Sequence, residues 1–213
     1  MKITKFGHCC LLVEVRGVRI LTDPGSFSVG QDVVGKVNLV LITHEHQDHI
    51  HIDSLKNILS NNPQATIITN TAVGKLLEKE NIAFVLLEDG QKYNYEKLSI
   101  EGVGKDHAFM FQGIPVVQNT GFLIGGDLFY PGDAFPKISQ KFSVLALPVS
   151  GPWMKLSEAL EYAEMVKPKI CFPVHDALLS QVGMNVTCRI SKMVLEKSGI
   201  EFREIKIGEE MEF

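Results

Sequence analysis

The chain has 213 residues, of which 45% are hydrophobic and 22% are charged, and its formal net charge at pH 7 is -4. These values are ordinary for a globular protein with one sizeable core, and we expect a single domain over residues 1–213. A net negative charge gives no sign of the positively charged surface that binds a nucleic-acid backbone, so we expect no nucleic-acid partner. The start of the chain shows no signal-peptide core, and no apolar run approaches the length of a membrane span. We therefore expect a cytoplasmic protein with no membrane partner.

The first 22 residues predict a start rich in hairpins. Residues 2–6 and 9–15 read as strands, and a tight turn leads into a third strand over 18–22. His8 lies between the first two strands, and Asp23 opens a Thr-Asp-Pro-Gly turn after the third. Taken alone, His8 is typical of a half-buried strand histidine and Asp23 of a turn former.

An apolar run over residues 37–42 predicts a buried strand, and the stretch His44-Glu45-His46-Gln47-Asp48-His49 follows it at once. These polar side chains leave the strand together and can turn back toward one point. Neutral imidazoles and a carboxylate are ligands that zinc and related divalent metals prefer. The alternative is a solvated histidine-rich loop. Three histidines and an aspartate within six positions, directly after a buried strand, favour a metal site.

The middle of the chain alternates between helical and extended patterns. Residues 50–59 and 71–80 have the apolar spacing of helices, whereas 65–69 and 83–87 read as strands. This alternation predicts an α/β class. His51, at the start of the first helix, is more typical of a solvated helix-start histidine than of a ligand.

Three further polar residues each follow a predicted strand. His107 comes after strands over 93–103, Asp133 after a hairpin over 120–130, and His175 directly ends an apolar strand. Taken alone, His107 is typical of a loop histidine and Asp133 of a turn residue. Because loops at one edge of a sheet are where open sites gather, the three side chains are candidates for the same site.

The last third of the chain predicts a helix over 156–166 with Ser157 as its N-cap, a helix over 185–198 and a strand over 201–207. The single tryptophan, Trp153, lies beside Gly and Pro after a strand. It could form a pocket wall or close the core, and the sequence favours neither. The four cysteines form no C-x-x-C pair, and three of them lie in apolar runs, so we expect buried reduced thiols.

The stretch from His44 to His49 fills every liganding position of the H-x-H-x-D-H signature of the metallo-β-lactamase superfamily, and the chain resembles that family. The resemblance implies an α/β fold, a four-layer αββα sandwich with one or two metal ions at a single edge of its two sheets. Gly-His-Cys at 7–9, Thr-Asp-Pro at 22–24, Pro-Gly-Asp at 131–133 and Pro-Val-His at 173–175 resemble a small metal-dependent hydrolase branch. That branch includes ascorbate 6-phosphate lactonase, and the similarity extends over essentially the whole chain.

The resemblance also implies a set of ligands for two ions. It assigns His44, His46 and His107 to one metal, Asp48, His49 and His175 to the other, and Asp133 to a bridging position between them. It places His8 and Asp23 beside the site. His46 stands where di-iron flavoproteins of the superfamily have Glu, which favours zinc, or manganese as in some relatives, over a redox iron pair.

The implied activity is that of a metal-dependent hydrolase with two divalent ions, zinc being expected. A metal-bound hydroxide would cleave a lactone, ester or phosphoester bond in a small-molecule substrate, and Asp48 would pass a proton to the leaving group. One alternative is a nuclease or phosphodiesterase of the same fold, although this chain lacks the added domain and basic groove usual there. The other is a non-enzymatic metal-binding protein, which would be expected to have lost ligands. The sequence leaves a homo-oligomer open.

Overall fold

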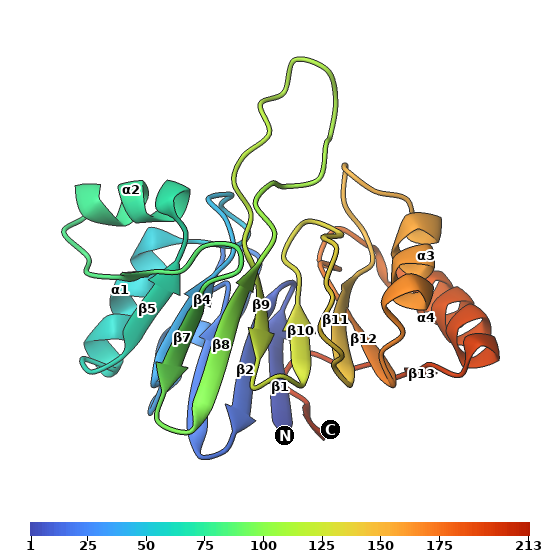
Figure 1. Cartoon of the computed structure of the whole chain (residues 1–213), viewed down its shortest axis with the longest axis horizontal. Helices are drawn as coiled ribbons and strands as arrows, with labels where there is room; N and C mark the ends of the chain where they lie inside the picture. The colour runs from blue at the N-terminus through green and yellow to red at the C-terminus, as the bar shows by residue number, and fades with distance from the viewer.

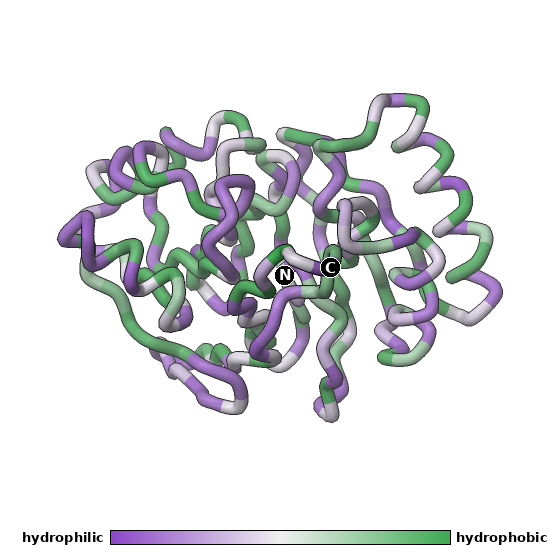
Figure 2. The backbone as a smooth tube through the Cα atoms, turned by 90° about the horizontal axis from the view of Figure 1, so that it is seen from above, coloured by the Kyte–Doolittle hydropathy of each residue, from purple (hydrophilic) through white to green (hydrophobic).

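Short apolar strands and amphipathic helices alternate along the chain, and a computed structural model describing residues 1–213 arranges them in four layers. Two seven-stranded sheets pack face to face, and a pair of helices covers the outer face of each (Figure 1). Seen from above, the two helix pairs lie at opposite ends of the molecule with the sheets between them (Figure 2). The αββα sandwich that the family resemblance implied is therefore confirmed.

The first sheet contains the strands of the N-terminal part and one strand from the C-terminus. Its order is β14 (Glu210–Glu212), β1 (Lys2–Gly7), β2 (Cys10–Val15), β3 (Val18–Thr22), β4 (Leu39–Ile42), β5 (Thr66–Thr69) and β6 (Val85–Leu86). The strands from β3 to β6 run parallel to one another, whereas the pairs β14–β1, β1–β2 and β2–β3 are antiparallel.

The second sheet is built from the later strands. Its order is β13 (Glu201–Phe202), β12 (Ile170–Val174), β11 (Val144–Pro148), β10 (Leu128–Tyr130), β9 (Gly121–Ile124), β8 (Leu98–Val103) and β7 (Lys92–Tyr95). The hairpin predicted around Gly125-Gly126 forms between β9 and β10.

The helices follow the predicted pattern with shifted ends. The α-helices are α1 (Ile52–Asn61), α2 (Thr71–Lys79), α3 (Leu156–Val166) and α4 (Gln181–Leu195), and there are short 3-10 turns at Gln31–Val33 and Glu196–Ser198. None of these helices combines the length and apolar composition that crossing a membrane requires.

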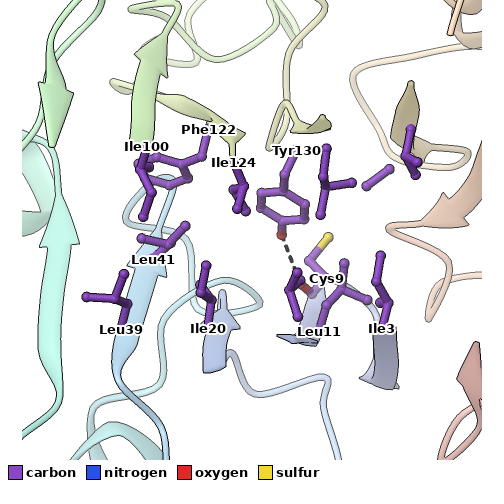
Figure 3. Close-up of a cluster of buried hydrophobic side chains, with 14 of the residues drawn as sticks. Ile3, Cys9, Leu11, Ile20, Leu39, Leu41, Ile100, Phe122, Ile124 and Tyr130 are labelled. Carbon is purple, nitrogen blue, oxygen red and sulfur yellow. Dashed lines mark hydrogen bonds between the residues drawn. The ribbon is translucent and has the colours of Figure 1, made fainter. Parts of the chain in front are cut away.

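Three apolar layers hold the four structural layers together. Within β4, Leu39 and Leu41 point into the layer between the sheets, whereas Val40 and Ile42 point toward α1 and α2. Figure 3 shows the layer between the sheets, where Leu41 of one sheet lies opposite Phe122 of the other. Each fully buried Leu or Ile contributes about 1.5–3 kcal/mol to folding, so both faces of these strands stabilise the sandwich.

Two local expectations were wrong. The N-cap of α3 is Lys155, not Ser157, and the side chain of Glu158 accepts the backbone N–H of Lys155 at 2.8 Å. In the segment predicted as a strand over 201–207, only β13 is a strand and Ile207 makes one isolated bridge to Lys5, whereas the unpredicted β14 pairs with β1. Both sheet-edge strands are short and partly exposed, so their sequences carry little apolar pattern.

Candidate metal centre

Each segment with a predicted site residue follows a strand that runs toward the same edge of its sheet. In the first sheet, β1, β3 and β4 share one direction, since β2 is antiparallel to both β1 and β3. In the second, β8, β10, β11 and β12 share one direction. The long loop that follows β8 stands at the top of Figure 1, which identifies this edge. Carboxyl ends of strands at one edge are a usual place for a ligand site.

Asp23 and Thr43 fix the imidazoles of His44 and His49. The Oδ2 atom of the fully buried Asp23 lies 2.7 Å from His49 Nδ1 and 2.8 Å from Thr43 Oγ1. Because a carboxylate accepts, His49 Nδ1 carries a hydrogen and the Thr43 hydroxyl donates to Asp23. Thr43 Oγ1 can then accept from His44 Nδ1 at 3.0 Å. In its neutral form, each ring thus presents an Nε2 lone pair to the site.

A first group of ligand atoms comes from His44, His46 and His107. The Nδ1 atom of His107 donates to the backbone oxygen of Ala108 at 2.7 Å, so its Nε2 faces the site. The Nε2 atom of His44 lies 3.0 Å from Nδ1 of His46. The ligand atoms of the three histidines all lie within 4.8 Å of one another, so they could hold one ion.

A second group surrounds Asp48. Its Oδ2 atom lies 3.1 Å from His8 Nε2 and 3.5 Å from His175 Nε2. His8 Nδ1 accepts the backbone N–H of Ala177 at 3.2 Å, so the ring hydrogen of neutral His8 is on Nε2 and is donated to Asp48. His8 therefore orients Asp48 and has no lone pair facing the site. Asp48, His49 and His175 have ligand atoms within 4.8 Å of one another and could hold a second ion.

Asp133 lies between the two groups. Its Oδ1 is 3.1 Å from His49 Nε2, and its Oδ2 is 2.8 Å from His175 Nε2 and 3.4 Å from His107 Nε2. It therefore contacts members of both groups, as a bridging ligand would. Trp153 is buried and donates its Nε1–H to Asp133 Oδ2 at 2.9 Å, so the tryptophan orients this carboxylate.

The backbone turns sharply at three of these positions. His8, Asp23 and His175 have positive φ angles of 48°, 35° and 58°. Such a conformation costs a non-glycine residue about 1–3 kcal/mol and gathers at functional sites. The turns at His8 and His175 support each other, since the His175 N–H donates to the His8 carbonyl at 3.2 Å across the two sheets.

Paired charges balance this site in the metal-free protein. Burial raises the pKa of Asp133, but His49 and the neighbouring His107 and His175 outweigh burial and hold that pKa well below its usual range. Burial lowers the pKa of His175, but the adjacent carboxylates of Asp133 and Asp48 outweigh burial and raise this pKa to about 10. A metal ion that uses His175 Nε2 must therefore displace a proton.

The residues present fit a metal ion, because several buried polar atoms of the cluster lie near one another without the geometry of a hydrogen bond. These atoms are His49 Nε2, His107 Nε2, Asp133 Oδ1 and both ring nitrogens of His175. A buried polar atom without a partner costs about 1–3 kcal/mol, so five in one cluster call for a further binding partner. Imidazole nitrogens and carboxylate oxygens are the donors that zinc and similar ions take.

Sequence analysis missed the residues that hold the candidate ligands in place. Asn119 is fully buried, accepts the Asp133 N–H at 3.0 Å and donates to the Pro131 carbonyl at 2.9 Å. Gly25 packs against the ligand loop, since a Cβ there would lie 1.8 Å from the carbonyl oxygen of Asp48. No residue pattern signals the role of Asn119, whereas the glycine after Asp-Pro could have been read as a point of close approach.

Two other residues with ligand chemistry have different surroundings. The His51 ring bonds Ser54 Oγ at 2.9 Å at the start of α1, as expected for a helix-start histidine. The Cys9 sulfur lies within 4.8 Å of ligand atoms of His49 and Asp133, although its side chain packs in the apolar layer between the sheets. All four cysteines are free and buried, as predicted.

The cluster opens into a cleft of about 330 Å³. Asp48 is the more accessible of the two site carboxylates, with 20% of its side chain exposed against 3% for Asp133. The cleft is therefore the route by which a small molecule can reach the cluster.

An αββα sandwich with a cluster of histidines and aspartates at one sheet edge defines a class of metal-binding proteins, and a comparison with known families supports membership in that class. Residues 2–175 match the family described as the beta-lactamase superfamily domain. The chain belongs to the metallo-β-lactamase superfamily.

Individual relatives span nearly the whole chain. It is 36% identical over 185 residues to Protein Rv0786c of Mycobacterium tuberculosis, covering 84% of this chain and 86% of that protein. It is 28% identical over 193 residues to a UPF0173 metal-dependent hydrolase of Carboxydothermus hydrogenoformans, covering 82% and 84%. The structure of Igni18, a metallo hydrolase from the archaeon Ignicoccus hospitalis, superposes with a TM-score of 0.77 at 24% identity, covering 100% and 98%, and shares its fold.

Proposed function

We propose that this chain is a metal-dependent hydrolase that cleaves a lactone, ester or phosphoester bond in a small molecule. The observation that carries the proposal is the convergence of unpaired ring nitrogens from separate loops. The other ring nitrogen of each histidine makes a hydrogen bond on the side away from the site. His49 Nδ1 donates to Asp23, and His107 Nδ1 donates to the Ala108 carbonyl. The relatives described as metal-dependent hydrolases support the same class.

Two divalent ions, zinc in our proposal, would be held by the two groups of side chains. His44, His46 and His107 would hold one, Asp48, His49 and His175 the other, and Asp133 would lie between them. When bound, such ions act as Lewis acids and lower the pKa of water to near 7. The chain supplies the position of each ligand atom through Asp23, His8 and the turns at the strand ends.

Asp48 is the residue we propose for proton transfer. Its Oδ2 faces His8 and His175, and no protein donor reaches its Oδ1. Because the side chain is partly exposed to the cleft, Oδ1 can take a proton from water and release it to the leaving group. Asp133 is only 3% exposed and its Oδ2 already accepts the Trp153 Nε1–H, so it is less suited to this role.

Metal loading and turnover together test this function. Protein stripped with a chelator would be reloaded with Zn²⁺ or Mn²⁺ and given lactone, carboxylic ester and phosphoester substrates. We expect His46→Ala to bind fewer ions and to lose activity by roughly 100-fold or more, as expected when an ion that polarises the substrate is lost. The matched control is His51→Ala, a histidine outside the cluster, which should behave as wild type.

Two results would contradict the proposal. One is the absence of bound transition metal in the reloaded protein, together with unchanged activity in His46→Ala. The other is tight metal binding without turnover of any substrate class, which would favour a non-enzymatic metal-binding protein.

A further inference from the structure

The cleft over the metal centre has no cationic wall. Its twelve lining residues include no Lys or Arg, and its ionisable members are the histidines and aspartates of the cluster itself. Lys105, in the loop that follows β8, points into solvent and lies 3.8 Å from Asp89. A phosphate or carboxylate group on a substrate would therefore find no side-chain counter-ion in these walls.

Apolar side chains from four loops form the rest of the wall. Phe27 follows β3, Met110 follows β8, Trp153 follows β11 and Leu178 follows β12. Phe27 is 45% exposed and Leu178 is 53% exposed, so much of this surface meets water when the cleft is empty. Large apolar side chains that converge on a cleft from separate loops mark a binding surface.

The loop between β8 and β9 extends this apolar surface. Its stem is hydrogen-bonded, with the His107 N–H donating to the Val117 carbonyl at 2.9 Å. Beyond the stem, the tip segment (residues 109–116) projects from the sheet edge, as Figure 1 shows. Phe109 and Phe111 of this segment are 64% and 69% exposed, while Met110 between them lines the cleft.

We propose that the substrate is a neutral ester or lactone with an alkyl or aryl group. This inference rests on the proposed hydrolase function and narrows it. The apolar group lies against Phe27, Met110 and Leu178 beneath the tip segment, and the acyl carbon faces the metal centre. Water oxygen joins that carbon, the acyl C–O bond breaks, and the proton goes to the leaving oxygen, giving an acid and an alcohol from an ester or one hydroxy acid from a lactone.

Burial of the apolar group supplies the specificity. Each methylene removed from water contributes enough to strengthen binding about fourfold when fully buried, so partial burial gives about two- to fourfold. A phosphate group gains nothing from these apolar side chains and meets no Lys or Arg in the cleft wall.

Trp153 provides a probe that does not depend on turnover. It is the only tryptophan of the chain and lies in the cleft wall, so its fluorescence reports ligands there. The metal-loaded protein would be titrated with γ-lactams whose alkyl side chains have one to eight carbons. We expect Kd to fall about two- to fourfold per methylene until the cleft is full. The hydrolysis arm compares kcat/KM for the matching γ-lactones and for phosphate monoesters.

Variants locate the effect. Phe27→Ser and Leu178→Ser should flatten the dependence of both Kd and kcat/KM on chain length, whereas the exposed Met193→Ser on α4, outside the cleft, should leave it as in wild type. A Kd that does not change with chain length, or higher kcat/KM for phosphate monoesters, would overturn the inference. So would a change in oligomeric state, instead of ligand affinity, in Phe109→Ser.

The two proposals fail separately. If short lactones are hydrolysed with no gain along the series, the hydrolase function holds and the apolar specificity is wrong. If lactams bind more tightly along the series but no bond is cleaved, the apolar site is supported and the hydrolase function is wrong.

Discussion

Replacing Asp23 with asparagine tests how the protein prepares His49 for a metal ion. The buried carboxylate takes four hydrogen bonds: from the N–H and O–H of Thr43, both at 2.8 Å, from His49 Nδ1 at 2.7 Å and from the Tyr130 hydroxyl at 2.6 Å. Asparagine keeps the shape but replaces one acceptor oxygen with an NH₂ group that only donates.

The arrangement of donors sets the size of the effect. Three donors meet Oδ2 and only one meets Oδ1, so the amide is expected to place its NH₂ against the Thr43 N–H. That leaves one buried donor unpaired at about 1–3 kcal/mol and turns three charge-assisted bonds into weaker neutral ones. We expect a total loss of about 2–4 kcal/mol in the free energy of unfolding. Because His49 loses its anionic partner, the Kd for Zn²⁺ should rise about 10- to 100-fold.

Two assays measure these quantities separately. Urea unfolding of the metal-free protein gives the stability change, and competition with a chromophoric chelator gives the Kd for Zn²⁺. The matched control is Asp53→Asn, which changes an exposed carboxylate in the first turn of α1. A Zn²⁺ affinity within twofold of wild type would refute the reasoning, because it would mean that Asp23 does not orient His49.

Three further outcomes are expected. Gly25→Ala should destabilise the fold by about 1–3 kcal/mol and weaken metal binding, because its Cβ would lie 1.8 Å from the carbonyl oxygen of Asp48 in the ligand loop. The control Gly35→Ala places its Cβ in open space and should change neither stability nor metal binding. Asn119→Ala should leave the Asp133 N–H and the Pro131 carbonyl without partners, which should lower the free energy of urea unfolding by about 1–3 kcal/mol for each group. The control Asn94→Ala, at an exposed residue, should stay within about 0.5 kcal/mol of wild type. The folded-state pKa of His175, about 10, lies above its ordinary value, so its protonation stabilises the metal-free protein below that ordinary value and this contribution is lost as pH rises through about 10. Zn²⁺ affinity should therefore increase with pH over the same window, with proton release seen by calorimetry in buffers of different ionisation enthalpy; pH-independent affinity would contradict the assignment.

The sequence predicted the features that local residue patterns determine. The apolar run before His44 predicted β4, and the alternation of helices and strands predicted the α/β class that the structure has. The family resemblance supplied the ligand set, which the structure gathers at one edge of the sheets. Whether these residues bind metal stays a prediction.

Features that depend on the fold as a whole could not be predicted. The role of Asn119 arises because β8, β9 and β10 bring its side chain beside the Asp133 backbone, and the chain between them carries no sign of it. The ring nitrogen that His8 offers to Asp48 is set by the backbone N–H of Ala177, 169 residues away. Strand β14 forms by backbone pairing with β1 at a sheet edge, where apolar alternation is not required.

An anomalous-difference map from crystals of Zn²⁺-loaded protein, collected on both sides of the zinc edge, tests the central claim most directly. The claim predicts two peaks, one among His44, His46 and His107 and one among Asp48, His49 and His175, with Asp133 between them. A map with no peak among these side chains, or with zinc bound only elsewhere on the protein, would contradict it.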